Sequence, residues 1–200
     1  MAIEAGASAL GLVSEMPSGP GVIPDARIAE IAAQVPPPVA TFLLTCRQDA
    51  DGIIAQHRVC RTGTIQLVDE VPVEELKKLR AGLPGIKLVQ VVHVAGPESV
   101  EEAAVPAPFV DAILLDSGNQ KLPVKELGGT GRTHDWTLSR RIRDTVGRPV
   151  FLAGGLAPDN VADAVRRVEP FGLDLCSGVR TKGALDPAKL GAFFAALAGA

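Results

Sequence analysis

The sequence lacks a cysteine framework, a strongly basic charge and any long hydrophobic run. Its three cysteines are an odd number without paired spacing, so neither a disulfide scaffold nor a zinc site is indicated. The net charge of −3, with lysines and arginines scattered among acids, argues against a nucleic-acid partner. The apolar run near the N-terminus is too short to span a membrane and follows no basic residues, so we expect no membrane association and no signal peptide. We therefore expect a cytoplasmic protein.

What is present is enough apolar sequence for one large core. The 200 residues are 46% hydrophobic and 22% charged, which suits a single domain over residues 1–200 and is short for two. Short apolar runs alternate with amphipathic segments, a pattern typical of parallel strands wrapped by helices. Strands are expected at residues 9–13, 40–44, 64–68, 86–94, 110–115, 150–153 and 173–175. Helices are expected at residues 24–35, 49–58, 73–79, 99–104, 136–146, 158–168 and 190–197.

These elements predict an α/β fold of the (βα)8 TIM-barrel type. Such a barrel needs eight parallel strands, and the sequence supplies seven strand-like runs. Residues 3–7 are interpreted as the last turn of a helix. We therefore expect the first strand and much of the first helix to be absent from this chain, leaving an open slot. Because the neighbouring strand edges would be unpaired, we predict a homodimer or strand exchange.

A carboxylate and a glycine-rich loop mark the first candidate site. The apolar run at residues 110–115 ends on Asp116, and Gly128, Gly129 and Gly131 follow around Thr130. A loop with so few side chains lets backbone N–H groups approach an anion or a substrate closely. Taken alone, the glycine pattern is weak, and Asp116 before Ser-Gly-Asn equally fits a turn or a helix cap.

Glycines also follow the next apolar run. Gly154 and Gly155 could form a simple turn from a strand to a helix, but their combination with Ser177 and Gly178 after the last strand favours anion binding.

Other reactive residue types are given structural roles. Cys46 and Cys176 each follow a strand and could face a pocket as a base, although buried inert thiols are the default interpretation. His57 is expected on a helix surface, and His93 is expected to be a hydrogen-bonded core residue. Asp69 and Glu70 also lie at the end of a strand and could face a pocket, but a capping role before Pro72 explains them equally well.

Three segments agree in sequence, order and spacing with one enzyme family. They are LLDS followed by GGTGRTHDW, then FLAGGLAPDNV, then LDLCSGV. Together they resemble phosphoribosylanthranilate isomerase, a βα barrel that performs an Amadori rearrangement in tryptophan biosynthesis. The resemblance implies a small phosphorylated sugar-anthranilate substrate, with neither a cofactor nor a metal.

The resemblance also implies roles for individual residues. Asp116 matches the general acid that protonates the furanose ring oxygen. The residues that match the phosphate-binding loops are Gly154, Gly155, Ser177, Gly178 and Val179. Those that match the mobile substrate loop are Gly128, Gly129, Thr130 and Gly131.

The sequence departs from the family pattern at several places. The family's lysine-isoleucine-cysteine-glycine motif, whose cysteine is the general base, has no counterpart here. Residues 18–23 contain no arginine for the anthranilate carboxylate, Val68 occupies the place of a histidine, and His134 that of an aromatic residue. We therefore expect impaired isomerase activity in this chain. The alternative is a non-catalytic or repurposed phosphate-binding barrel related to the family.

Overall fold

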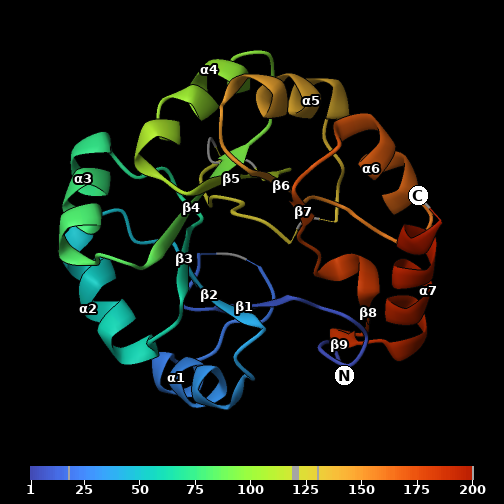
Figure 1. Cartoon of the computed structure of the whole chain (residues 1–200), viewed down its shortest axis with the longest axis horizontal. Helices are drawn as coiled ribbons and strands as arrows, with labels where there is room; N and C mark the ends of the chain where they lie inside the picture. The colour runs from blue at the N-terminus through green and yellow to red at the C-terminus, as the bar shows by residue number, and fades with distance from the viewer. Residues whose placement is uncertain (18, 119–121, 130, 200) are drawn as a thin grey trace.

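The structure, a computed structural model, describes residues 1–17, 19–118, 122–129 and 131–199. A parallel sheet follows the order of the chain and curls inside a ring of helices (Figure 1). Its strands are β1 (Ala9–Val13), β2 (Ala40–Thr45), β3 (Thr64–Leu67), β4 (Lys87–His93), β5 (Ala112–Asp116), β6 (Val150–Leu152) and β7 (Gly172–Leu173). The helices are α1 (Asp25–Gln34), α2 (Ala50–Cys60), α3 (Val73–Gly82), α4 (Ser99–Ala104), α5 (Trp136–Thr145), α6 (Val161–Val168) and α7 (Pro187–Ala198). The predicted α/β class, a parallel sheet wrapped by helices, is confirmed.

The two faces of the sheet bury different sets of side chains. Because successive side chains of a strand point to opposite faces, Ile113 and Leu115 pack outward against the helices, whereas Ala112 and Leu114 point into the interior of the curled sheet. Both faces are therefore apolar, which explains why the strands form nearly continuous hydrophobic runs in the sequence.

Aspartates define where several helices begin. Asp49 accepts a hydrogen bond from the Gly52 amide at the start of α2, and Asp135 accepts one from the Thr137 amide at the start of α5. Asp186 caps α7 in the same way. Each side chain satisfies an amide that has no partner within its helix, so these caps fix the positions of the loops that precede them.

The sheet has two free ends among the described residues. Strand β1 is paired along its length with β2, and its other side carries a single bridge from Val13 to Val22. Strand β7 pairs with β6, and no described strand joins β7 to β1. The expected open slot therefore lies between these two strands.

Some local expectations were wrong. Residues 180–185 form an unpredicted hairpin of β8 (Arg180–Thr181) and β9 (Ala184–Leu185). Two short 3-10 helices, η1 (Ala107–Phe109) and η2 (Ser177–Val179), were also unforeseen. His57 is not a surface residue, because it is 8% exposed and its Nε2 lies 2.7 Å from the Thr62 carbonyl oxygen.

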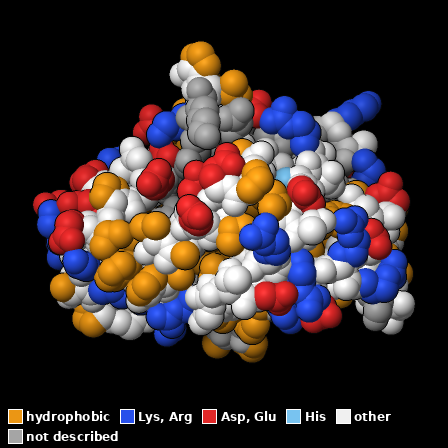
Figure 2. Space-filling model, turned by 90° about the horizontal axis from the view of Figure 1, so that it is seen from above, with side chains coloured by type: hydrophobic (Ala, Val, Ile, Leu, Met, Phe, Trp, Pro, Cys, Tyr) orange, Lys and Arg blue, Asp and Glu red, His pale blue; other side chains and the backbone are white. Residues whose placement is uncertain are grey.

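The surface carries mixed charge. Figure 2 shows basic and acidic side chains interspersed across one face, with hydrophobic side chains between them. On that face no single basic area stands out that would suit a nucleic-acid backbone. Within the described residues, every helix is too short or too polar to span a lipid bilayer.

Candidate active site

The carboxyl ends of the parallel strands surround a cavity of about 200 Å³. Asp116 ends β5, Gly154 and Gly155 follow β6, and Asp174 follows β7. These four residues all line the cavity. In open or closed parallel sheets this end is where loops assemble binding sites, so the topology places the predicted carboxylate and the predicted glycines together.

Asp116 is held at the wall of this cavity. Its Oδ1 accepts a hydrogen bond from the Ser117 amide at 2.7 Å, and β5 is paired with β4 so that His93 stands opposite Asp116. Burial raises the pKa of Asp116, while the Ser117 hydrogen bond and His93 oppose this effect. A buried carboxyl with a raised pKa keeps its proton more readily than an exposed one, as a general acid requires.

The glycine loop covers Asp116. Gly128, Gly129 and Gly131 line the cavity, and Thr130 lies outside the described residues. Gly128 has a φ of 133°, and a Cβ there would lie 2.7 Å from Asp116 Oδ2. Glycine is therefore needed at this position both for its backbone conformation and for the close approach to the carboxylate.

The two loops assigned to phosphate binding pack on each other. Gly155 has a φ of 63°, and Ser177 lines the cavity beside Gly154 and Gly155. Gly178 lies against the Leu156 carbonyl oxygen, where a Cβ would be 1.9 Å away. Val179 is 3% exposed and its side chain belongs to the outer core. The structure thus brings Gly154, Gly155 and Ser177 to the cavity wall, while Gly178 and Val179 support the wall from behind.

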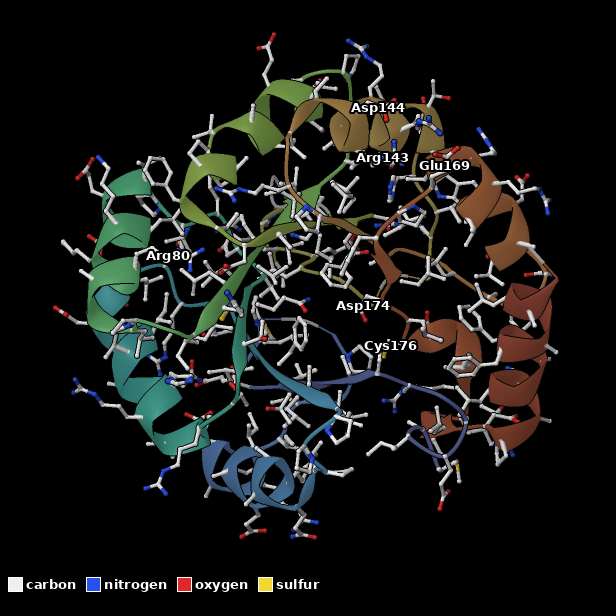
Figure 3. All side chains as sticks on the ribbon, viewed as in Figure 1. Arg80, Arg143, Asp144, Glu169, Asp174 and Cys176 are labelled. Carbon is white, nitrogen blue, oxygen red and sulfur yellow. The ribbon has the colours of Figure 1, made fainter. Side chains whose placement is uncertain are left out.

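Asp174 is the functional candidate that the sequence interpretation missed. It lines the cavity, and Figure 3 shows it pointing from the strand region toward the centre of the ring. The buried Gln66 side chain donates a hydrogen bond to it. Burial and the nearby charge of Asp116 raise the pKa of Asp174 to about 6. The available signal was a single acid inside the apolar run Leu173 to Leu175.

The cysteines and histidines mostly take the structural roles expected of them. His93 is 7% exposed with Nε2 3.0 Å from the Val68 carbonyl oxygen. Cys46 donates to the Glu15 carbonyl oxygen, and burial raises the pKa of its thiol, which suits an inert residue. Cys176 does line the cavity. Because it lines the cavity, Cys176 is retained as a candidate for a chemical role.

The comparisons with known proteins agree on one family. The model of the N-(5'-phosphoribosyl)anthranilate (PRA) isomerase family matches residues 2–196. The isomerase of Haloferax volcanii is 40% identical over 180 residues, which span 90% of this chain and 77% of the relative. The isomerase of Halobacterium salinarum is 37% identical over 199 residues, which span 97% of this chain and 87% of the relative.

Solved structures are similar throughout the chain. The phosphoribosyl anthranilate isomerase of Thermotoga maritima superposes with a TM-score of 0.83 at 29% identity, covering 100% of this chain and 92% of that one. An isomerase structure in complex with reduced 1-(o-carboxyphenylamino)-1-deoxyribulose 5-phosphate gives a TM-score of 0.80 at 28% identity, covering 100% and 91%. The chain described here belongs to the N-(5'-phosphoribosyl)anthranilate isomerase family.

Proposed function

We propose that this chain carries the site for the Amadori rearrangement of N-(5'-phosphoribosyl)anthranilate to 1-(2-carboxyphenylamino)-1-deoxyribulose 5-phosphate. The observation that carries the proposal is Asp116, a carboxyl with a raised pKa that shares one cavity with the glycines after β5 and β6. A similar isomerase binds the reduced form of this product, which supports the substrate class.

In the proposed reaction Asp116 is the general acid. Its carboxyl proton moves to the oxygen of the furanose ring, the bond from C1 to that oxygen breaks, and the nitrogen lone pair forms an iminium at C1. A base then removes the proton at C2 and leaves an enolamine, which becomes the ketone product. The family resemblance assigns this base to the cysteine of a motif that the present sequence does not contain.

The sugar phosphate is proposed to bind where the loops after β6 and β7 meet. Gly154 and Gly155 present backbone without side chains, and Ser177 adds a hydroxyl at the cavity wall. Gly178 and Val179 continue the η2 turn that carries Ser177. Unpaired N–H groups in such turns suit a phosphate dianion. The glycine loop at residues 128–131 is proposed to close over the substrate.

The decisive experiment is turnover of the fluorescent substrate by Asp116→Asn. A positioned general acid contributes about 10²- to 10⁴-fold, so we expect a loss of kcat/KM of that order. The assay is run on the 200-residue chain and on the chain extended by its upstream coding sequence. The matched control is Asp163→Asn, an exposed carboxylate on α6. Near-normal turnover by Asp116→Asn in an active chain would refute the assignment.

The second candidate is a phosphate-binding barrel without isomerase activity. Val68, where the family has a histidine, lines the cavity with an apolar side chain, which favours this alternative. It predicts that the chain and its extended form bind inorganic phosphate but leave the substrate fluorescence unchanged. Restored turnover on extension would exclude it.

We also propose that the chain forms a homodimer in the cytoplasm. The free edges of β1 and β7 can pair with a second copy, and the isomerase of Thermotoga maritima is described as dimeric. The three thiols are unpaired, which suits a reducing compartment. Light scattering over a range of concentrations tests the dimer, and a constant monomer mass would reject it.

A further inference from the structure

Asp116 and Asp174 stand at the same level of the sheet, two strands apart. Both β5 and β7 are hydrogen-bonded to β6, with Leu115 in register with Leu152 and Leu152 in register with Leu173. Each aspartate lies one residue beyond this register. Residues at one level of neighbouring parallel strands point to the same face, so both carboxyls project into the interior.

The residue between them leaves room for the two carboxyls to interact. At this level β6 continues into Ala153, which lines the cavity with only a methyl group. Two strand spacings separate the aspartate backbones by roughly 10 Å, and side chains on the concave face of a curled sheet converge from there. The charge of Asp116 accordingly acts on Asp174.

Hydrogen-bond donors from neighbouring residues hold both carboxyls in place. Gln66 on β3 and the Leu175 amide donate hydrogen bonds to Asp174, and the Ser117 amide donates one to Asp116. Among the described residues, the other ionisable groups near the pair are His93 on β4, His134 before α5, and Cys176 and Arg180, which line the same cavity. Asp69 and its ion-pair partner Lys125 line a second cavity together with His93. Arg180 donates to the Gly183 carbonyl oxygen, so part of its guanidinium is already engaged in the hairpin.

We infer that Asp116 and Asp174 hold one proton between them in mildly acidic solution, so that the acid of this site is a carboxyl pair and not Asp116 alone. Two carboxyls in one enclosed site resist ionising together, because the second negative charge must form beside the first. The pair then has a net charge of about −1 and contains an acid and a base at the same time.

The directions of the pKa shifts agree with this arrangement. Burial is the main cause at both positions and raises the pKa of each carboxyl. The charge of Asp116 adds to burial at Asp174, whose pKa reaches about 6. The last proton of the pair therefore leaves near pH 6, above the range of an ordinary aspartate.

The role of the shared proton rests on the proposed function. Ring opening transfers the proton of the pair to the sugar oxygen, and an iminium with one positive charge appears at C1. The pair simultaneously gains one negative charge, so the total charge is conserved. Two carboxylates then face the cation that has formed, and a preorganised anionic site stabilises developing positive charge. Asp174 thus contributes without itself touching the ring oxygen.

The test is a pH titration of the protein labelled with ¹³C at the aspartate Cγ, followed by NMR. The Asp116 and Asp174 signals are assigned from Asp116→Asn and Asp174→Asn. In the unsubstituted protein each signal is expected to show two steps, with the later one near pH 6. In Asp174→Asn the Asp116 signal is expected to show one step, at a lower pH than the later step of the unsubstituted protein.

Gln66→Leu and Asp163→Asn complete the test. Gln66→Leu removes the hydrogen bond that lowers the pKa of Asp174, so the later step moves to higher pH. Asp163→Asn, on the exposed face of α6, leaves both titrations unchanged. An Asp116 titration that is the same with and without Asp174, or a single Asp174 step at the pH of an ordinary aspartate, overturns the inference.

Turnover separates this inference from the proposed function. In an active chain, Asp174→Asn is expected to shift the pH profile of kcat/KM in the same direction as the Asp116 titration, and an unshifted profile contradicts the shared-proton role. If the titrations show two steps but neither form of the chain turns over the substrate, the carboxyl pair is supported. In that case only the isomerase reaction is rejected, by the missing turnover.

Discussion

At the scale of single residues, Asp174 and His134 respond to burial in opposite ways. Removing an ionisable group from water disfavours its charged form, which raises the pKa of an acid and lowers that of a base. The pKa of Asp174 rises to about 6, and the pKa of His134 falls to about 4. Each shift links the free energy of folding to pH, with opposite signs over an overlapping range.

Asp174→Asn is expected to stabilise the protein at pH 7.5. The folded state of the unsubstituted protein binds the Asp174 proton more tightly than the unfolded state does. The stability that this proton contributes is complete below about pH 4 and is lost as the pH rises through 6. Removing the charge should therefore raise the free energy of unfolding at pH 7.5 by about 1–3 kcal/mol, with little effect at pH 4. Urea titrations at both pH values measure this, with Asp163→Asn as control. A less stable variant at pH 7.5 would contradict the assignment.

His134→Gln is expected to reduce the loss of stability in mild acid. The neutral ring of His134 lies with Nε2 2.7 Å from Ser139 Oγ, and the folded state resists its protonation. The contribution of the neutral His134 ring to the free energy of unfolding is present above the ordinary histidine pKa of 6.5 and is lost as the pH falls through 4. Between pH 7 and pH 4 the unsubstituted protein should lose about 1–3 kcal/mol more than the variant. Equal losses in urea titrations would show that His134 does not titrate in this range.

The sequence showed only half of the candidate carboxyl pair. Asp116 could be identified because an apolar run stops on it and a turn signal follows. Asp174 could not, because one acid between Leu173 and Leu175 does not reveal which face of the strand it occupies. That face depends on the register with β6, which brings together residues far apart in the sequence.

At the scale of elements, the loop after β6 and the η2 turn depend on one close contact. A Cβ at position 178 would lie 1.9 Å from the Leu156 carbonyl oxygen, and backbone cannot move aside as a flexible side chain can. Gly178→Ala is therefore expected to destabilise the protein by about 1–3 kcal/mol and to weaken phosphate binding. Thermal unfolding and phosphate titration by calorimetry measure the two effects.

Gly191→Ala is the matched control for this substitution. Gly191 lies in the interior of α7, is exposed, and has nothing within 4 Å of an added Cβ. Alanine there should raise stability by up to about 1 kcal/mol, because glycine is a poor helix former. Similar losses in the two variants would show that the position of the methyl group is immaterial.

The regular elements were predictable and the shortest ones were not. Helix α4 was expected at residues 99–104 and spans Ser99–Ala104, because its apolar spacing and its boundaries are local features. The β8–β9 hairpin has two residues in each strand, too few to show any alternation. Its turn instead relies on Lys182 and Gly183, which both have positive φ.

At the scale of the whole molecule, the side of β1 that no described strand covers is the feature that most affects assembly. The Ser14 amide donates to Leu44 of β2, and amides alternate in direction along a strand. The Leu10 amide therefore points to β2, and the Gly11 amide points to the open edge. A strand of a second copy that pairs with this edge would accept a hydrogen bond from the Gly11 amide and from other amides of β1 that point the same way.

Gly11→Pro is expected to abolish the proposed dimer while leaving the sheet intact. Proline removes an amide donor and is tolerated on edge strands whose N–H faces outward. The ring atoms would approach the flexible end of Leu44, which is the nearest group to a Cβ at this position, at 3.2 Å. Light scattering should give a dimer mass for the unsubstituted chain and a monomer mass for the variant.

Leu10→Pro distinguishes loss of an edge from loss of the fold. Because the Leu10 amide is directed at β2, proline there removes a ladder hydrogen bond and should lower the free energy of unfolding by about 3 kcal/mol or more. Gly11→Pro should differ from the unsubstituted chain by much less in the same urea titration. A Gly11→Pro protein that remains dimeric would place the interface on another surface, and equal destabilisation by the two prolines would show that both amides support the β1–β2 ladder.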